Sequence, residues 1–366
     1  MTGLRSNLSC LQKNNKPLTS FILAVIGYDK SLKNQGFVDF SGLQNLSSYE
    51  KDINKILSSA QSGHGYNIEN LISMLTSFFK NMETYCELFK FVVDYGINEE
   101  NTSVFIKNIR ALANNCYLFK IQITNIQEFL LGYYSAFSED ERNFLSIVGK
   151  LNAAIGGDNG VLENISHELK NIQKKIDSAG SDAVVSAFGI SVGALMICVG
   201  AIGEFLTGGV STAVVLGGIG LITAGIAGEG VSAAQLIELN NEKASLLNQE
   251  ANLEAEVKIA AAISHGYSSL IAQVDNAKGL GLNMCYAAEN IESDLLEIAN
   301  DLESGSTSID IVRTLFIDAA ANEMSTLLSD VKIMKEQISS LAIHCAMSNQ
   351  TVSELIAALA KNFELN

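Results

Sequence analysis

Apolar residues recur every three or four positions along most of the chain, which is the spacing of one face of a helix. This pattern is clear over residues 67–95 and again over residues 102–137, and Gly96 provides a stop after the first range. Residues 43–62 also predict a helix, whereas residues 1–40 predict a polar arm followed by a short helix. Because no strand pattern accompanies these ranges, the chain is predicted to be all-α.

Helix signals continue through the second half of the chain. Residues 138–141, Ser-Glu-Asp-Glu, form a capping box that predicts the start of a new helix, with a pause at the glycine-rich residues 156–160. Apolar residues from Met324 to Leu359 follow a heptad seam, and a second seam runs from Leu236 to Ala260. These seams favour a helical bundle that packs on itself over an intermolecular coiled coil.

A long apolar stretch interrupts this amphipathic pattern. Residues 183–203 contain no charge over 21 positions and residues 205–228 contain none over 24, with Glu204 between them. At roughly 1.5 Å per residue, each run would form a helix of about 30–36 Å, which matches the hydrocarbon core of a bilayer. The sequence therefore predicts an apolar helical hairpin, residues 183–237, whose tip lies near Gly208-Gly209.

The predicted hairpin offers two sets of candidate site residues. Its large apolar side chains are expected to insert into a membrane: Val184, Val185, Phe188, Ile190, Val192, Leu195, Ile197, Val199, Ile202, Phe205, Leu206, Val214, Val215, Leu216, Ile219, Leu221, Ile222 and Ile226. Its small residues form stripes that would let helices approach closely in lipid: Gly189, Gly193, Gly200, Gly217, Gly220, Ala224 and Gly228. The high glycine content also suits a segment that changes conformation.

Two other interpretations of the hairpin stay open. An apolar hairpin can be the buried core pair of a soluble bundle, or it can be two permanent transmembrane helices. Against the second, the flanking charges are acidic, with Asp177 and Asp182 before the runs and Glu229 and Glu238 after them, whereas topology signals are usually Lys and Arg. The polar patterning of the rest of the chain favours a soluble protein whose hairpin inserts conditionally.

The composition narrows the range of partners. The chain has 40 acidic and 24 basic residues and a formal net charge of −16, which argues against a nucleic-acid partner. The same excess disfavours electrostatic attachment to anionic lipid, so membrane binding would depend on apolar burial. The single proline, Pro17, favours long uninterrupted helices.

Signals for catalysis are weak. Residues 189–193, Gly-Ile-Ser-Val-Gly, match a hydrolase elbow but lie inside an uncharged run without strand context. Residues 228–233 fit a dinucleotide-binding loop on paper but follow no βαβ strand. The four histidines are solitary and the six cysteines lack metal-ligand spacing, so they are interpreted as polar helix or loop residues and as buried thiols. The chain is predicted to be no enzyme and to need no cofactor or metal.

This arrangement resembles the cytolysin A-like α-helical pore-forming toxins, whose relatives include haemolysin BL and the non-haemolytic enterotoxin. The residues that carry the resemblance are 183–193 and 214–228, inside long helices that lead to the hairpin and back from it. Because both apolar runs are full length, the chain looks most like the B component of the Gram-negative tripartite toxins.

The resemblance implies an elongated long-helix bundle, called the tail, and a small apolar helical-hairpin head that unfolds into extended helices on assembly. The tail would comprise residues 1–178 and 241–366, and the head residues 179–240. The resemblance also implies three kinds of partner: a target-cell lipid membrane, further copies of the chain and two further toxin components.

Two functions of different class follow from these observations. The first is a secreted pore-forming toxin component that converts from a soluble form to an oligomeric transmembrane helical pore in the host cell membrane. The second is a structural or signalling coiled-coil protein with two permanent transmembrane helices. The apolar run at residues 21–27 is too short for a good signal peptide, so secretion would use another route.

Overall fold

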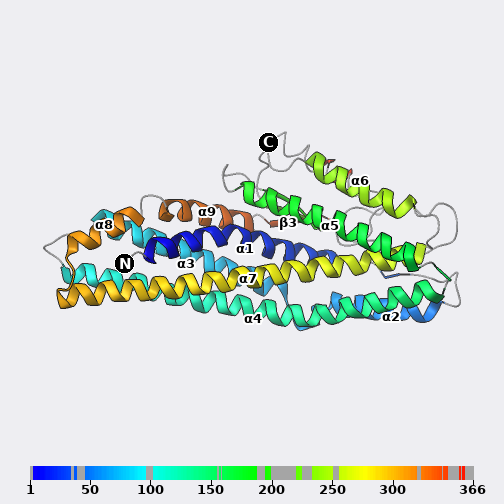
Figure 1. Cartoon of the computed structure of the whole chain (residues 1–366), viewed down its shortest axis with the longest axis horizontal. Coiled ribbons are helices and arrows are strands. Elements are labelled where there is room, and N and C mark those ends of the chain that lie inside the picture. The colour runs from blue at the N-terminus through cyan, green and yellow to red at the C-terminus, as the bar shows by residue number, and fades with distance from the viewer. Residues whose placement is uncertain are drawn as a thin grey trace. The chain divides into compact units, whose positions relative to one another are not determined.

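The computed structural model consists mainly of long helices (Figure 1). It describes residues 3–33, 37–38, 46–95, 102–154, 156–157, 159–187, 194–198, 220–224, 233–249, 255–319, 323–339, 341–344, 354–355 and 357–358. The helices are α1 (Gly3–Lys33), α2 (Ser47–Gln61), the 3-10 turn η2 (Gly63–Gly65), α3 (Ile68–Tyr95), α4 (Thr102–Ala154), α5 (Asn159–Ala187), α6 (Ala233–Gln249), α7 (Ala255–Ser304), α8 (Ile309–Ala319) and α9 (Ser325–Ser339). The strands are β1 (Ala194–Cys198), β2 (Gly220–Ala224) and β3 (Leu341–His344).

The prediction of a long-helix bundle is confirmed. Helix α4 has 53 residues and α7 has 50, and α3 occupies the predicted range almost to the residue. The predicted pause also occurs, because α4 ends at Ala154, Gly156 adopts a positive φ of 71°, and α5 begins at Asn159. Burial follows the predicted periodicity: on α4 the buried side chains include Phe105, Ile109, Leu112, Cys116, Phe119, Ile123, Ile126 and Leu130.

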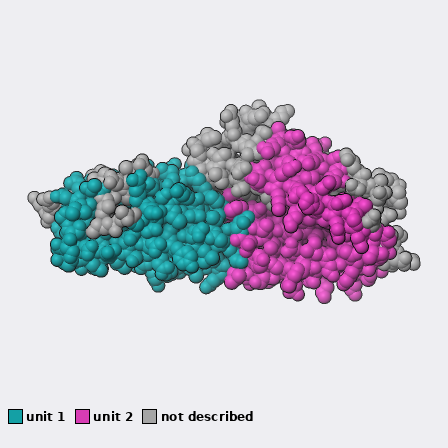
Figure 2. Space-filling view, in the orientation of Figure 1, with its two compact units in different colours: residues 1–19, 69–130, 276–339 teal, residues 20–68, 131–275, 340–366 magenta. Residues whose placement is uncertain are grey.

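The chain forms two compact units, shown in different colours in Figure 2. Unit 1 comprises residues 1–19, 69–130 and 276–339, and unit 2 comprises residues 20–68, 131–275 and 340–366. Each unit therefore combines three stretches that are distant in sequence. The predicted division into tail and head stays a prediction.

Each unit has an aromatic core of its own. In unit 1, Tyr85 meets Phe119 edge-on, with ring centroids 5.2 Å apart. In unit 2, Tyr133 stacks on Phe137 at 4.3 Å, and Tyr267 lies 6.2 Å from Phe137. Aromatic pairs in these geometries add roughly 0.5–1.5 kcal/mol each beyond the burial of their area.

Helix α1 differs from the predicted polar arm. It runs unbroken over 31 residues with Pro17 inside it. A proline in a helix interior removes one backbone hydrogen bond. Helix α1 nevertheless buries Leu4, Leu8, Leu11, Leu18, Ile22, Leu23, Val25 and Ile26. Burial of so many large apolar side chains outweighs the local cost of the proline, because each contributes about 1.5–3 kcal/mol.

The predicted helix start at Ser138 is also wrong, since α4 continues through this residue. A capping box marks a helix start only where the preceding backbone leaves the helix. Here Phe137 and Phe144 are both fully buried on the same helix, and Asp140 between them is 5% exposed. Packing on both sides of Ser138 therefore keeps the backbone helical.

The apolar segment contains strands where helices were predicted. Strands β1, β2 and β3 form an antiparallel sheet in that order. The prediction of a helical hairpin is thus wrong for residues 194–198 and 220–224, and the predicted heptad seam is interrupted at Leu341, the first residue of β3. A helix that is apolar all round has no polar face to expose to water, and its glycines lower its helix propensity. Pairing in a sheet satisfies the backbone N–H and C=O groups equally well.

Candidate functional site

The candidate site is the apolar segment between α5 and α6. Among the predicted membrane-inserting residues, Val184 and Val185 belong to α5, Leu195 and Ile197 to β1, and Leu221 and Ile222 to β2. Of the predicted small residues, Gly220 and Ala224 are the two ends of β2. The others lie outside the described residues: Phe188, Gly189, Ile190, Val192, Gly193, Val199, Gly200, Ile202, Phe205, Leu206, Val214, Val215, Leu216, Gly217, Ile219, Ile226 and Gly228. No helix among the described residues combines the length and the apolarity that a membrane crossing needs.

The register of the sheet ties the apolar segment to the C-terminal part of the chain. Ala194 of β1 is opposite Ala224 of β2, and Cys198 is opposite Gly220. On its other edge, β2 pairs with β3, where Leu221 is opposite His344 and Ala224 is opposite Leu341. Strand β3 therefore occupies an edge of β2 that would otherwise carry unpaired backbone groups.

A polar chain of hydrogen bonds joins the two helices that flank the apolar segment. The Lys243 Nζ of α6 donates to Gln173 Oε1 of α5 at 2.9 Å. The Gln173 Nε2 donates in turn to the hydroxyl of Tyr28 in α1 at 2.8 Å. All three side chains are buried. A buried polar group that loses its partner destabilises the folded protein. These hydrogen bonds therefore hold α5 and α6 in a defined arrangement.

His265 of α7 is a titratable group in this part of unit 2. Burial, together with the positive charges of Lys243 and Lys170, lowers its pKa to about 4. The imidazole is therefore neutral at neutral pH.

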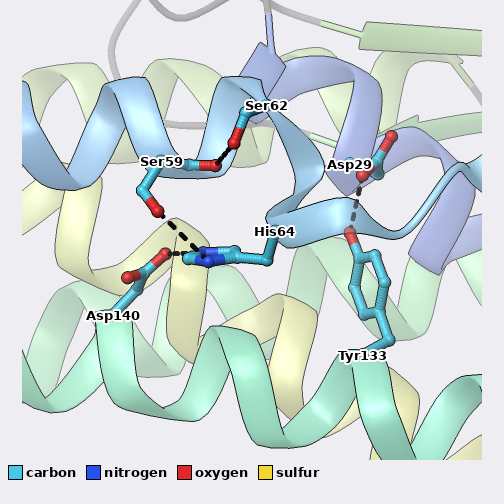
Figure 3. Close-up of polar contacts among 6 residues, drawn as sticks. All are labelled: Asp29, Ser59, Ser62, His64, Tyr133 and Asp140. Atoms are coloured by element: carbon cyan, nitrogen blue, oxygen red, sulfur yellow. Dashed lines mark hydrogen bonds and ion pairs between the residues drawn. The ribbon is translucent and has the colours of Figure 1, made fainter.

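A strained turn lies between α2 and α3 in the same unit. Gly63, His64 and Gly65 have φ values of 68°, 48° and 83°, and His64 is the one non-glycine residue with positive φ in the described part of the chain. The His64 Nε2 lies 2.6 Å from Asp140 Oδ2 of α4, and Nδ1 lies 3.1 Å from the Ser59 hydroxyl of α2 (Figure 3). The imidazole also meets Phe137 edge-on at 5.0 Å. Strained conformations of this kind persist where surrounding contacts fix them.

A second buried carboxylate lies close to this turn in Figure 3. The Tyr133 hydroxyl donates to Asp29 Oδ1 at 2.8 Å, and Lys33 Nζ lies 2.8 Å from Asp29 Oδ2. Burial raises the pKa of Asp29, and the contacts with Lys33 and Tyr133 oppose that rise. Burial likewise raises the pKa of Asp140, against the opposing effect of His64. Both carboxylates thus depend on their partners to stay ionised inside the protein.

Next to this turn, the segment between η2 and α3 approaches helix α4 closely. A Cβ atom at Gly132 of α4 would overlap the hydroxyl and ring of Tyr66. The Tyr66 ring is itself positioned edge-on to Tyr133, with centroids 6.2 Å apart.

Ser59, His64 and Asp140 are the residue types of a hydrolase triad. The contacts of the His64 imidazole indicate a structural role instead. Both imidazole nitrogens are occupied by side chains from two different helices, so His64 joins the turn to α4 and to the end of α2. The sequence interpretation of His64 as a solitary polar residue missed this role. The Gly-His-Gly break was visible, but Asp140 is 76 residues away in sequence.

Metal and thiol chemistry find little support in the described residues. No group of His, Cys, Asp and Glu side chains there could hold a metal ion. Burial raises the pKa of Cys86 and of Cys116 to about 12, which makes both thiols poor nucleophiles.

Comparisons with known proteins point to one family. A family model described as Bacillus haemolytic enterotoxin (HBL) matches residues 6–179, and no curated protein matches the chain in sequence. Soluble SmhB of the tripartite toxin Smh from Serratia marcescens is 24% identical with a TM-score of 0.84, over 97% of this chain and 99% of that chain. Soluble AhlB of the tripartite toxin AHL from Aeromonas hydrophila is 26% identical with a TM-score of 0.82, over 96% and 99%.

The same comparisons include an assembled form. The AhlB pore from Aeromonas hydrophila is 22% identical with a TM-score of 0.60, over 92% of this chain and 99% of that chain. The chain thus has a fold closer to the soluble forms than to this pore form. Residues 6–179, just under half of the chain, thus resemble the Bacillus haemolytic enterotoxin (HBL) family, and the whole chain has the fold of soluble SmhB and AhlB.

Proposed function

We propose that this protein is a pore-forming toxin component that converts from a soluble form to an oligomeric transmembrane helical pore. The structure corresponds to the soluble form, in which part of the apolar segment is held as strands. Conversion would release β2 from β3 and refold residues 183–237 into a helical hairpin that spans the bilayer. The domain division proposed with it makes residues 179–240 the membrane-inserting head.

The observation that carries this proposal is the combination of two full-length apolar runs with a sheet form that cannot span a bilayer. Every backbone donor and acceptor must be satisfied within a membrane, so helices and closed barrels are the structures that cross it. A sheet of three strands has two edges, whereas each apolar run as a helix would reach across the hydrocarbon core. A change from strand to helix is therefore needed before the segment inserts.

The large apolar residues and the small residues predicted from the sequence would have different roles in this conversion. The large apolar side chains from Val184 to Ile226 would face lipid. The small residues from Gly189 to Gly228 would let the two helices of the hairpin, or helices of neighbouring copies, approach closely. Because the segment is apolar and not basic, its affinity would depend little on anionic lipid.

The proposal includes the partners and the location. The similar proteins SmhB, AhlB and SmhA are components of tripartite toxins, so we propose two further components in addition to other copies of the chain. We propose that the protein is secreted and acts on the membrane of a host cell. Apolar insertion and self-assembly account for this activity without a catalytic group or a cofactor.

Dye release from lipid vesicles tests the function directly. The full chain would be added to phosphatidylcholine–cholesterol vesicles, first alone and then with purified candidate partner components. We expect the chain to be soluble without detergent, to float with the vesicles and to release dye, with the largest release in the presence of partners. Extraction of the expressed chain from cells only with detergent would instead support the alternative with two permanent transmembrane helices.

A further inference from the structure

Five large apolar side chains are exposed on two helices of unit 1. They are Tyr117, Leu118 and Ile121 on α4, and Leu282 and Tyr286 on α7, with exposed fractions of 39–62%. Below they are called the α4–α7 patch.

Contacts between the two helices place Ile121 and Tyr286 at nearly the same level. Lys120 Nζ lies 2.7 Å from Glu289 Oε1, and Thr124 Oγ1 lies 3.8 Å from Cys285 Sγ. At the level of Gly281, the helices approach so closely that an added Cβ would lie 2.9 Å from the side-chain nitrogen of Gln127. This antiparallel register sets the level of Ile121 beside that of Tyr286.

The inner faces of the same helices show that the patch points outward. On α4 the fully buried residues Phe119 and Ile123 flank Ile121, and on α7 Met284 and Ala288 flank Tyr286. Residues four positions apart, such as Tyr117 and Ile121 or Leu282 and Tyr286, share one helix face. The two pairs therefore follow one another along the outer side of the α4–α7 contact, with Ile121 and Tyr286 nearest each other.

The charge of this region is unusual for the chain. Residues 114–125 and 279–290 contain one basic and one acidic residue, Lys120 and Glu289, and these two pair with each other. The region is thus neutral in a chain whose formal charge is −16. Two copies of so acidic a chain repel over most surfaces, but not where these neutral regions meet.

We propose that the α4–α7 patch binds the same patch of a second copy of this chain. Protein interface cores are depleted in charge and enriched in tyrosine and other aromatic residues, as this patch is. A contact between equivalent patches needs no complementary surface elsewhere on the molecule. A contact of this kind joins two copies and no more, so the inference goes beyond the proposed pore function and can fail or hold independently of it.

Charge substitutions at Tyr286 and Ile121 test the contact. Tyr286→Glu and Ile121→Glu place like charges opposite each other, so both should reduce self-association of the full chain in sedimentation velocity and in amine cross-linking by at least about tenfold. Leu145→Glu is the matched control, because Leu145 is 53% exposed on the same helix but lies outside the patch. It should associate like the parent. Circular dichroism would verify that all variants keep the helical content of the parent.

A mixing experiment tests the partner. An equimolar mixture of Tyr286→Glu and Tyr286→Lys should recover association that neither variant shows alone, because opposite charges then meet across the contact. No recovery, or equal association of the parent and both Glu variants, would overturn the proposal. The measurements use the free chain at high concentration and the chain on phosphatidylcholine–cholesterol vesicles. If the free chain associates through the patch but vesicles neither bind nor leak, the inference stands and the proposed function fails.

Discussion

At the scale of single residues, the turn at His64 combines an unfavourable backbone with favourable side-chain contacts. A left-handed conformation costs a residue with a Cβ roughly 1–2 kcal/mol. The contacts with Asp140, Ser59 and Phe137 offset this cost and explain why the turn holds a histidine between two glycines. The buried Asp140 in turn relies on His64 as its partner.

We predict that His64→Ala lowers the free energy of unfolding by about 3 kcal/mol, because it leaves a buried carboxylate without its partner and keeps the unfavourable φ. His64→Gly should be about 1 kcal/mol more stable than His64→Ala, because glycine adopts positive φ readily. Urea unfolding followed by circular dichroism measures both values. His167→Ala, at an exposed histidine of α5, should change stability by less than about 0.5 kcal/mol. Equal stability of the Ala and Gly variants would argue against backbone strain at this position.

His265 connects stability to pH. Its pKa in the folded protein is lowered to about 4, so between this value and the ordinary value near 6.5 the unfolded chain binds a proton that the folded chain does not. The free energy of unfolding contributed by His265 is therefore full above pH 6.5 and falls as the pH drops towards 4.

We expect the parent to lose up to about 2 kcal/mol more stability than His265→Gln when the pH is lowered from 7 to 5. The buried Asp29, Asp140 and Asp330, whose pKa values are raised, act in the opposite direction. They are present in both proteins and cancel in the comparison. Parallel stability curves for parent and variant would contradict the lowered pKa of His265.

At the scale of elements, periodicity predicted the helices and missed what depends on distant partners. Helix α3 and the pause before α5 follow from local spacing and glycines, so the sequence was sufficient for them. The unbroken α1 and α4 depend on burial against neighbouring helices, which overrides a proline in one and a capping box in the other. Strand β3 could not be recognised, because its pairing partner β2 lies far earlier in the chain, with Leu341 opposite Ala224.

The candidate site was also only partly predictable. The uncharged runs identify the apolar segment from composition alone, because no other stretch has this length without charge. Its folding into strands depends on pairing with β3 and on packing against α5. The hydrogen-bonded residues Gln173 and Lys243, on the flanking helices, have the sequence pattern of ordinary surface residues of amphipathic helices. Local patterns carry no information on such contacts.

A disulfide between β2 and β3 should stop the conversion. Thr223 and Ala342 are Cα partners in the antiparallel pair, and Cα atoms in such pairs lie roughly 4.5–5.5 Å apart, within the range of disulfides. We predict that oxidised Thr223→Cys/Ala342→Cys loses most of its dye release from vesicles and regains it after reduction.

Thr223→Cys alone provides the control for this pair, because it tests whether the new thiol reacts with a native cysteine. Full dye release by the oxidised double variant, with the disulfide verified by mass spectrometry, would mean that β2 need not leave β3.

At the scale of the whole molecule, membrane insertion and the helical scaffold should be separable. The three stretches of unit 1 lie outside residues 183–228, so deletion of this range leaves the unit 1 core complete. We predict that the deletion variant stays helical by circular dichroism and no longer floats with vesicles. Vesicle binding equal to that of the parent would assign membrane attachment to another segment.

The tight contact between Gly132 and Tyr66 has a consequence for how the sequence can vary. A selection of functional variants from a library randomised at position 132 should return glycine almost alone, although alanine is the better helix former. Alanine should return when position 66 is randomised together with it, and then beside smaller residues. Substitution at position 132 is therefore restricted until the ring at position 66 has been lost, so the order of the two changes is fixed.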